Sequence, residues 1–256
     1  MKGKEVIFRV DGSHKLGIGH LMRCLEIADE LKLRKGIRSV FFSHHSPLQV
    51  SITSQFNHKI FYHRGYSGEV TISREIRNYV AEMRPDGLIF DLAPDLTPRE
   101  LKTIESINIP KIIFDDHGGA RNRFDTVINA IAHPDHQKPQ DRTTGIFQGP
   151  DYIILPQGND SDSGWNIESN KILIAMGGSD PFNITLKALK AMSSLKTNHE
   201  IHLLLGPGYN FTGSIEDARK DVYQPLFIHK DLPIDEISPF LKKFKLGIMS
   251  FGLTVY

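Results

Sequence analysis

The sequence between residues 9 and 20 reads Arg9-Val10-Asp11-Gly12-Ser13-His14-Lys15-Leu16-Gly17-Ile18-Gly19-His20. It follows an apolar run, Val6-Ile7-Phe8, and leads into a helical pattern that begins near Gly19 and ends at Gly36. A strand, a glycine loop and a helix in this order form the first unit of an α/β nucleotide-binding domain. Because glycines allow close backbone approach and the first amides of a helix attract anions, we expect a ligand site here.

His20 stands where this helix is expected to begin. The helix dipole disfavours a positively charged imidazole at that end, so we expect a neutral histidine that can accept a proton. The spacing differs from the dinucleotide fingerprint, because Met22 stands at the third glycine position, and no Walker lysine follows. The simpler interpretation, in which His20 only forms a local hydrogen bond, stays open at this point.

Composition limits the class of protein. The 256 residues carry a formal net charge of +1, so no basic face and no nucleic-acid partner are expected. The single cysteine, Cys24, cannot form an internal disulfide and is expected to be buried in a reducing compartment. No apolar run approaches the roughly 20 residues of a membrane span, and no signal-peptide pattern is present. We therefore expect a cytoplasmic protein without a membrane partner, and the oligomeric state stays open.

The first half alternates between apolar runs and helical patterns. Strands are predicted at residues 6–10, 40–42, 59–62, 87–91, 111–116 and 126–131, and helices at 19–35, 47–55, 70–83 and from 97 onward. The run at 126–131 is expected to be the last strand of this half. Strands that are apolar on both faces indicate a parallel sheet covered on both sides. Asp11, Asp91 and Asp115-Asp116-His117 follow strand ends, so we expect them near one ligand site.

The second half repeats this style after a polar linker, Asn159–Gly164. We therefore expect one domain at residues 1–158 and a second at 159–256. Strands are predicted at 171–176, 200–205, 225–229 and 246–250, and helices at 183–194 and 234–244. A loop, Gly177-Gly178-Ser179-Asp180, follows the first of these strands and could hold phosphate with its amides and the Ser179 hydroxyl. The last strand lacks a covering helix, so this domain is expected to be incomplete.

The pattern as a whole predicts an α/β protein with two Rossmann-like domains and a cleft between them. Each domain has a glycine loop after its first strand. This is the GT-B-like arrangement of enzymes that act on nucleotide sugars.

Several motifs resemble those of one family. In chain order they are Arg9, Asp11, Gly17-Ile18-Gly19-His20, Arg23-Cys24-Leu25, Ala28, Asp115-Asp116, Gly149-Pro150, Tyr152, Gly177-Gly178-Ser179-Asp180-Pro181 and Asn183. Together they resemble the PseG/SpsG family, which comprises the UDP-sugar hydrolase of the pseudaminic-acid pathway and the spore-coat polysaccharide protein SpsG. The resemblance covers essentially the whole chain.

The resemblance implies a fold related to the glycosyltransferase MurG and hydrolysis of UDP-2,4-diacetamido-2,4,6-trideoxy-β-L-altrose to UDP and free sugar. It also implies cleavage of the anomeric C–O bond with inversion, no metal or cofactor, and His20 as the acceptor of the proton from water. Asp11 is expected to orient His20 or the water. Candidate substrate-binding residues are Arg9, Gly17, Ile18, Gly19, Tyr152, Gly177, Gly178, Ser179, Asn183 and Thr254.

Three segments depart from the family pattern. Pro156-Gln157 replaces a basic residue after the tyrosine motif, and Leu92-Ala93 lacks the aromatic residue expected after Asp91. Phe251 replaces a glycine of the C-terminal motif, whose glutamate would lie beyond Tyr256. The substrate is therefore not restricted to the altrose derivative.

Other functions fit part of the pattern. A GT-B glycosyltransferase would use the same base on a sugar hydroxyl, and a non-catalytic nucleotide-sugar-binding fragment would bind without turnover. A metal hydrolase is less favoured, since His133 and His136 flank Pro134 in a polar loop instead of sharing a helix face. Its other candidate ligands are Asp115, Asp116 and His117.

Overall fold

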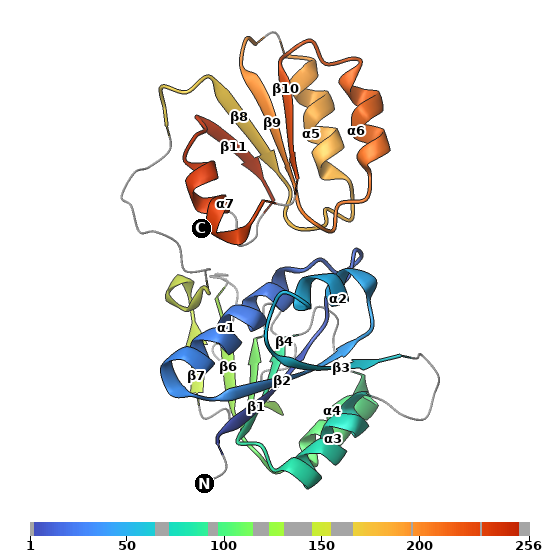
Figure 1. The fold of residues 1–256 in the computed structure, drawn as a ribbon, viewed down its shortest axis with the longest axis vertical. Helices are drawn as coiled ribbons and strands as arrows, with labels where there is room; N and C mark the ends of the chain where they lie inside the picture. Colours follow the sequence, from blue (N-terminus) through green and yellow to red (C-terminus); the bar gives the residue numbers. More distant parts are fainter. Residues whose placement is uncertain are drawn as a thin grey trace. The chain divides into compact units, whose positions relative to one another are not determined.

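The structure is a computed structural model that describes residues 3–64, 72–91, 97–114, 123–130, 145–154, 166–195, 197–230 and 232–250. The chain divides into two compact units, one formed by Met1–Gly12 and His20–Ile154 and the other by Ser13–Gly19 and Leu155–Tyr256. Each unit has one parallel sheet with helices on both faces, so the predicted α/β class is confirmed (Figure 1). The predicted domain boundary after residue 158 lies outside the described residues.

The first unit contains a seven-stranded sheet in the order β3-β2-β1-β4-β5-β6-β7. Its strands are β1 (Glu5–Val10), β2 (Arg38–His44), β3 (Lys59–His63), β4 (Gly87–Asp91), β5 (Lys111–Phe114), β6 (Thr126–Asn129) and β7 (Gly145–Gln148). β1 and β4 pair in a register that places Val10 opposite Asp91. The chain proceeds from β1 through β2 to β3 on one side and resumes with β4 on the other, so the strand order reverses beside β1.

Local sequence signals explain the helices of this unit, which are α1 (Gly19–Lys35), α2 (Pro47–Thr53), α3 (Ile72–Met83), α4 (Pro98–Glu105) and the short 3-10 helix η2 (Pro150–Tyr152). The apolar stripe of α1 is buried, and Gly36 ends the helix in the left-handed region with a φ of 63°. At the start of α4, Thr97 and Glu100 form a capping box.

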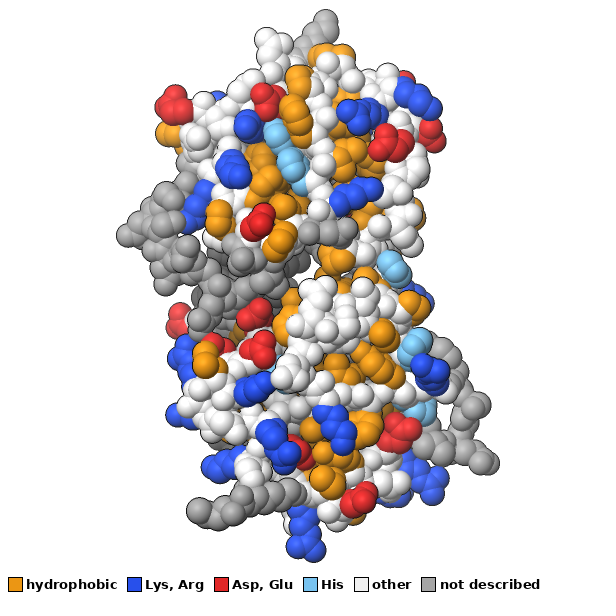
Figure 2. All heavy atoms as spheres, in the orientation of Figure 1, with side chains coloured by type: hydrophobic (Ala, Val, Ile, Leu, Met, Phe, Trp, Pro, Cys, Tyr) orange, Lys and Arg blue, Asp and Glu red, His pale blue; other side chains and the backbone are white. Residues whose placement is uncertain are grey.

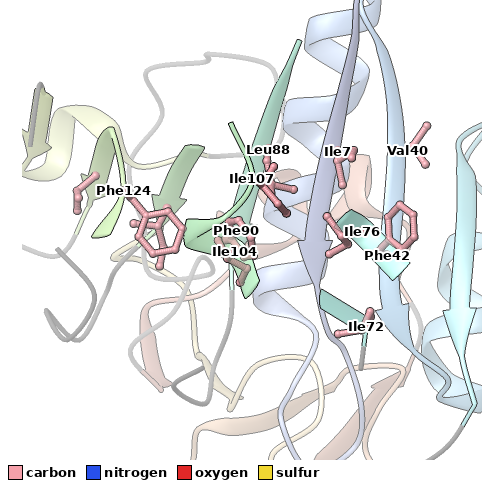
Figure 3. Close-up of a cluster of buried hydrophobic side chains, with 12 residues drawn as sticks. Ile7, Val40, Phe42, Ile72, Ile76, Leu88, Phe90, Ile104, Ile107 and Phe124 are labelled. Carbon is pink, nitrogen blue, oxygen red and sulfur yellow. The ribbon is translucent and has the colours of Figure 1, made fainter. Parts of the chain in front are cut away.

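Two apolar layers pack against this sheet. The layer beneath α3 and α4 contains Ile7, Val40, Phe42, Ile72, Ile76, Leu88, Phe90, Ile104, Ile107, Ile113, Phe124 and Val127 (Figure 3). On the opposite face, covered by α1, the rings of Phe8 and Phe41 stack with their centroids 4.9 Å apart. Because neighbouring strand residues point to opposite faces, Ile7 and Phe8 belong to different layers.

The second unit contains a four-stranded parallel sheet in the order β10-β9-β8-β11. Its elements are β8 (Lys171–Ala175), α5 (Ile184–Ser193), β9 (Glu200–Leu205), α6 (Thr212–Arg219), β10 (Leu226–Lys230), α7 (Ile234–Leu241) and β11 (Leu246–Met249). α5 and α6 cover one face through Leu189, Met192 and Ile215, whereas Phe240 of α7 packs with Leu173 on the other.

The sequence prediction misses β7, α6 and the short 3-10 helix η2. The strand near residues 126–131 is not the last of its unit, because β7 is added at the sheet edge, and α6 was not predicted at all. β7 is a short edge strand with Phe147 and Gln148 exposed, so its apolar signal is weak. In α6 only Ile215 and Ala218 are buried, which is too few for a helical period in the sequence.

The described surface carries charges of both signs. Figure 2 shows Lys and Arg side chains interspersed with Asp and Glu side chains over the visible face of each unit. Of the helices in the described ranges, none is both long enough and apolar enough to cross a bilayer.

Candidate functional site

The candidate site of the first unit lies at the carboxyl ends of β1 and β4. In open α/β sheets, ligands bind beyond the carboxyl ends at the point where strand order reverses. That point lies between β1 and β4. His20 is the second residue of α1, which follows β1, and Asp91 is the last residue of β4. The sheet thus brings together a histidine and a carboxylate that are 71 residues apart in the sequence.

A short hydrogen bond joins these two side chains. Nδ1 of His20 lies 2.6 Å from Oδ1 of Asp91, whose side chain is 0% exposed. Arg23, one helical turn after His20, donates from Nε to Oδ2 and from Nη2 to Oδ1 of Asp91, each at 2.7 Å. The Arg23 guanidinium also lies over the ring of Phe114, with its central carbon 4.8 Å from the ring centroid. Asp91 is therefore bound from two positions of α1.

The charge of Asp91 determines which nitrogen of His20 carries a hydrogen. Burial alone would raise the pKa of Asp91, but hydrogen bonds from His20 and Arg23 outweigh it and lower the pKa below 3.8. An ionised carboxylate only accepts hydrogen bonds, so Nδ1 of His20 must donate. Nε2 then holds the lone pair. It has no partner among the described residues, and the His20 side chain is 23% exposed.

Asp11 has other partners than the sequence led us to expect. Its carboxylate accepts hydrogen bonds from Nη2 of Arg9 at 2.9 Å and from the backbone N–H of His44 at 2.8 Å. Burial would raise the pKa of Asp11, but the bonds from His44 and Arg9 prevail and hold it well below its usual range. The carboxylate bound to His20 is Asp91, so the expectation that Asp11 orients His20 is corrected. Asp11 instead joins the end of β1 to the end of β2.

Arg9 is a buried partner of this carboxylate, with 4% of its side chain exposed. Its Nη1 lies 2.7 Å from Oδ1 of Asp11. The predicted role of Arg9 in substrate binding stays a prediction, because what the structure shows is an internal ion pair.

The signal for Asp91 was present in the sequence, as an acid that ends a strongly apolar strand, but nothing local linked it to His20.

Cys24 lies next to the same cluster. Its Sγ is 3.6 Å from Oδ2 of Asp91, and the residue is buried, as predicted. Burial and the charge of Asp91 raise the pKa of the Cys24 thiol. The side chain therefore stays a neutral, unreactive thiol and not a nucleophile.

The second glycine loop, Gly177-Gly178-Ser179, follows β8 in the second unit. Gly177 has a φ of 77°, a conformation that favours glycine. The carbonyl oxygen of Gly178 accepts a hydrogen bond from the N–H of Gly208 at 2.7 Å. The N–H groups of Gly178 and Ser179 have no acceptor among the described residues, although Ser179 itself is buried. Unpaired amides of this kind can bind an anion.

The start of α5 is already occupied by a carboxylate of the chain itself. Asp180 accepts hydrogen bonds from the N–H groups of Ile184 at 2.8 Å and Thr185 at 2.7 Å. These amides are therefore not open to a phosphate, and the predicted cradle, which consists of amides in the loop before α5, does not include them. Asn183 makes no capping bond but accepts a hydrogen bond from the hydroxyl of Tyr209 at 2.7 Å.

Residues 13–19 belong to the second unit. Gly17, with a φ of 84°, closes a turn held by backbone hydrogen bonds of 2.8 and 3.1 Å. The side chain of Ile18 fills the space that a Cβ on Gly178 would need, and a Cβ on Gly17 would lie 3.6 Å from Oγ of Ser179. Four predicted substrate-binding residues thus come together within this unit.

The structure says less about the roles of the remaining predicted site residues. Gly19 is the first residue of α1, and Tyr152 is exposed in η2 with its ring centroid 5.4 Å from that of Phe147. Residues 115–117, 133, 136 and Thr254 lie outside the described residues. Across the described ranges, no group of three or more His, Cys, Asp and Glu side chains is arranged to hold a metal ion.

Comparison with known proteins gives two relatives at the level of sequence, although no family model matches the chain. An uncharacterized protein of Methanocaldococcus jannaschii, MJ1062, is 27% identical over 265 residues, which cover 98% of this chain and 53% of that protein. The chain thus spans about half of the length of this relative.

The spore coat polysaccharide biosynthesis protein SpsG of Bacillus subtilis is 30% identical over 259 residues, which cover 96% of this chain and 71% of SpsG. This chain belongs to the SpsG family. The resemblance to PseG/SpsG expected from the motifs is confirmed.

Solved structures establish the fold of this SpsG-family chain. MurG of Acinetobacter baumannii superposes with a TM-score of 0.63 at 14% identity, covering 98% of this chain and 74% of MurG. HepE of Anabaena, determined in complex with UDP-glucose, gives 0.57 at 10% identity, covering 94% of this chain and 72% of HepE. The chain therefore has a GT-B-type fold with two Rossmann-like units.

Proposed function

We propose that this SpsG-family protein hydrolyses a UDP-sugar at the anomeric carbon with inversion, with Nε2 of His20 as the proton acceptor. The observation that carries the proposal is the His20–Asp91 pair. Buried, ionised Asp91 holds Nδ1, and Nε2 has no partner among the described residues at the reversal point of the sheet. Family membership and the UDP-glucose complex of HepE, which has the same fold, support a nucleotide sugar as the ligand class.

The reaction needs one base and a stabilised leaving group. The oxygen of a water molecule forms a bond to the anomeric carbon, the bond from that carbon to the phosphate oxygen breaks, and its electron pair leaves with UDP. The proton of the water moves to Nε2 of His20 in an oxocarbenium-like transition state. Asp91 stabilises the resulting imidazolium through Nδ1–H. UDP is a good leaving group, so no protein acid is required.

The glycine loop of the second unit is the proposed binding element for the diphosphate. Negative charge accumulates on the diphosphate as the bond breaks, and fixed amide N–H groups stabilise it in the transition state. The N–H groups of Gly178 and Ser179 are the candidates, because both have no acceptor in the described part of the chain.

UDP release tests the proposal. Wild type, His20→Ala and His58→Ala would be offered the altrose-derived UDP-sugar and UDP-glucose. His58 is a matched control because it pairs with Asp29 at 2.9 Å, a second histidine–aspartate pair of the same unit. We expect His20→Ala to lose about 10²-fold or more in turnover and His58→Ala to retain it. Equal turnover in wild type and His20→Ala would overturn the assignment.

The same base could act on a sugar hydroxyl instead of water. Adding acceptor sugars to the assay therefore separates the two reactions. A glycoside product would replace the hydrolase proposal with a glycosyltransferase, and UDP binding without turnover of any sugar would replace it with a binding function.

A further inference from the structure

The turn after β9 contacts the glycine loop after β8 backbone to backbone. A Cβ on Gly206 would lie 2.5 Å from Cα and 2.6 Å from the carbonyl oxygen of Gly178. Both are main-chain atoms, so no change of rotamer could make room for them. Position 206 therefore accepts only glycine while the loop keeps its place.

Two hydrogen bonds hold the same two segments together. The N–H of Gly208 donates to the carbonyl of Gly178 at 2.7 Å, and the hydroxyl of Tyr209 donates to Oδ1 of Asn183 at 2.7 Å. Burial, with a contribution from the charge of Asp180, raises the pKa of Tyr209 to about 12, so its hydroxyl keeps the proton that it donates. The turn thus binds the loop both near its beginning and just before α5.

The bond to Gly178 sets the direction of the next amide. In a planar trans peptide, the carbonyl and the following N–H point in opposite directions. Because the carbonyl of Gly178 is directed at Gly208, the N–H of Ser179 is directed away from the turn. This N–H has no acceptor among the described residues, so the turn presets an amide that an anion can use.

We propose that residues 206–209 position the phosphate-binding loop, with Gly206 and Tyr209 as the positioning residues. This inference rests on the proposed function, because the anion is the diphosphate of the UDP-sugar. Amides that are already oriented bind charge without a cost of rearrangement. Loosening the turn therefore weakens binding of the phosphates and leaves binding of the nucleoside unchanged.

Binding of UDP and of uridine to the full chain, measured by NMR titration, tests this inference. The variants are Tyr209→Phe and Gly206→Ala, and the matched controls are Tyr223→Phe and Gly213→Ala. Tyr223 also donates its hydroxyl to a carbonyl of this unit, that of Leu195, and a Cβ on Gly213 would meet nothing within 4 Å. We expect the Kd for UDP to rise about tenfold in the variants, with the Kd for uridine and both controls unchanged.

Each outcome is decisive. Tyr209→Phe removes one hydroxyl, so it stays informative if Gly206→Ala does not fold. UDP affinity equal to wild type in Tyr209→Phe would overturn the positioning role, and so would a parallel loss of UDP and uridine affinity, which marks a merely structural role. A wild-type chain that binds UDP no better than uridine would contradict the proposed function itself, which separates the two failures.

Discussion

Oδ1 of Asp91 lies 2.6 Å from Nδ1 of His20, and the carboxylate is shielded from solvent while the histidine ring is partly exposed. The buried partner determines which nitrogen carries the hydrogen, and the exposed partner presents the other nitrogen. A carboxylate that orients an imidazole in this way also stabilises the imidazolium that forms when the base takes a proton.

Asp91→Asn should lower turnover by about 10²-fold or more, because an amide neither holds the same tautomer of His20 nor stabilises its charged form. It should also destabilise the first unit, since Arg23 loses the anion that it binds twice. UDP release and thermal unfolding measure the two effects. Asp29→Asn, which removes the partner of His58, is the control. Unchanged turnover in Asp91→Asn would contradict the role of the pair.

Asp11→Asn should cost about 3–5 kcal/mol of unfolding free energy, because it leaves the buried guanidinium of Arg9 without its carboxylate. Urea titration followed by circular dichroism measures this loss. Glu105→Gln, which breaks a half-exposed ion pair with Arg123, should change the midpoint little. Equal effects of the two substitutions on the free energy of unfolding would contradict the expectation that a buried ion pair contributes more to stability than an exposed one.

Stability of the second unit should fall on mild acidification. Nδ1 of His202 lies 2.9 Å from Nε2 of His229, and the rings stack with centroids 5.2 Å apart. Burial lowers the pKa of both histidines below 6.5. The charge of Lys171 lowers both values further, and that of Lys243 lowers the pKa of His229, whereas Glu200 opposes the shift at His202.

The sign of this effect follows from the neutral form being the one that the fold favours. The contribution of the two neutral histidines to the free energy of unfolding is complete above 6.5, the pKa in the unfolded chain. It is lost as the pH falls through 6.5 toward the lower pKa values of the folded chain. Thermal unfolding between about pH 8 and pH 5 measures it. His229→Gln should flatten the dependence, and a melting temperature that rises on acidification would contradict the prediction.

Gly36→Ala should cost about 1 kcal/mol through backbone strain alone, because Gly36 has a φ of 63° and a Cβ there would meet nothing within 4 Å. Gly213→Ala has equal space but no positive φ, so it should not destabilise the chain. Denaturant midpoints of the two variants, compared side by side, check the expectation. A loss in both would point to a cause other than the left-handed conformation.

Local signals made most of the fold predictable. The bounds of α1 follow from its apolar period and from Gly36. Both of these signals depend only on residues that are close together in the sequence. β7 and α6 escaped because a short edge strand and a helix with few buried residues leave little pattern.

The site was predictable only in its parts. His20 and Asp91 each stood out locally, but their pairing depends on β4 lying beside β1, which no local pattern encodes. Likewise, the sequence suggested the loop at residues 177–180 as a phosphate cradle, and only the structure shows that the Asp180 side chain of this loop binds the first amides of α5.

The register that sets Val10 opposite Asp91 also sets the stage of folding at which the pair that the proposed function requires can form. β2, β3 and three helices separate these two strands in the chain, and such non-local parallel pairs form slowly because a long loop must close first. A slip of one residue would turn Asp91 to the other face of the sheet, away from His20. During refolding, the appearance of activity would therefore mark the docking of β4 in its native register, and a chain arrested before that step would hold a histidine without its carboxylate.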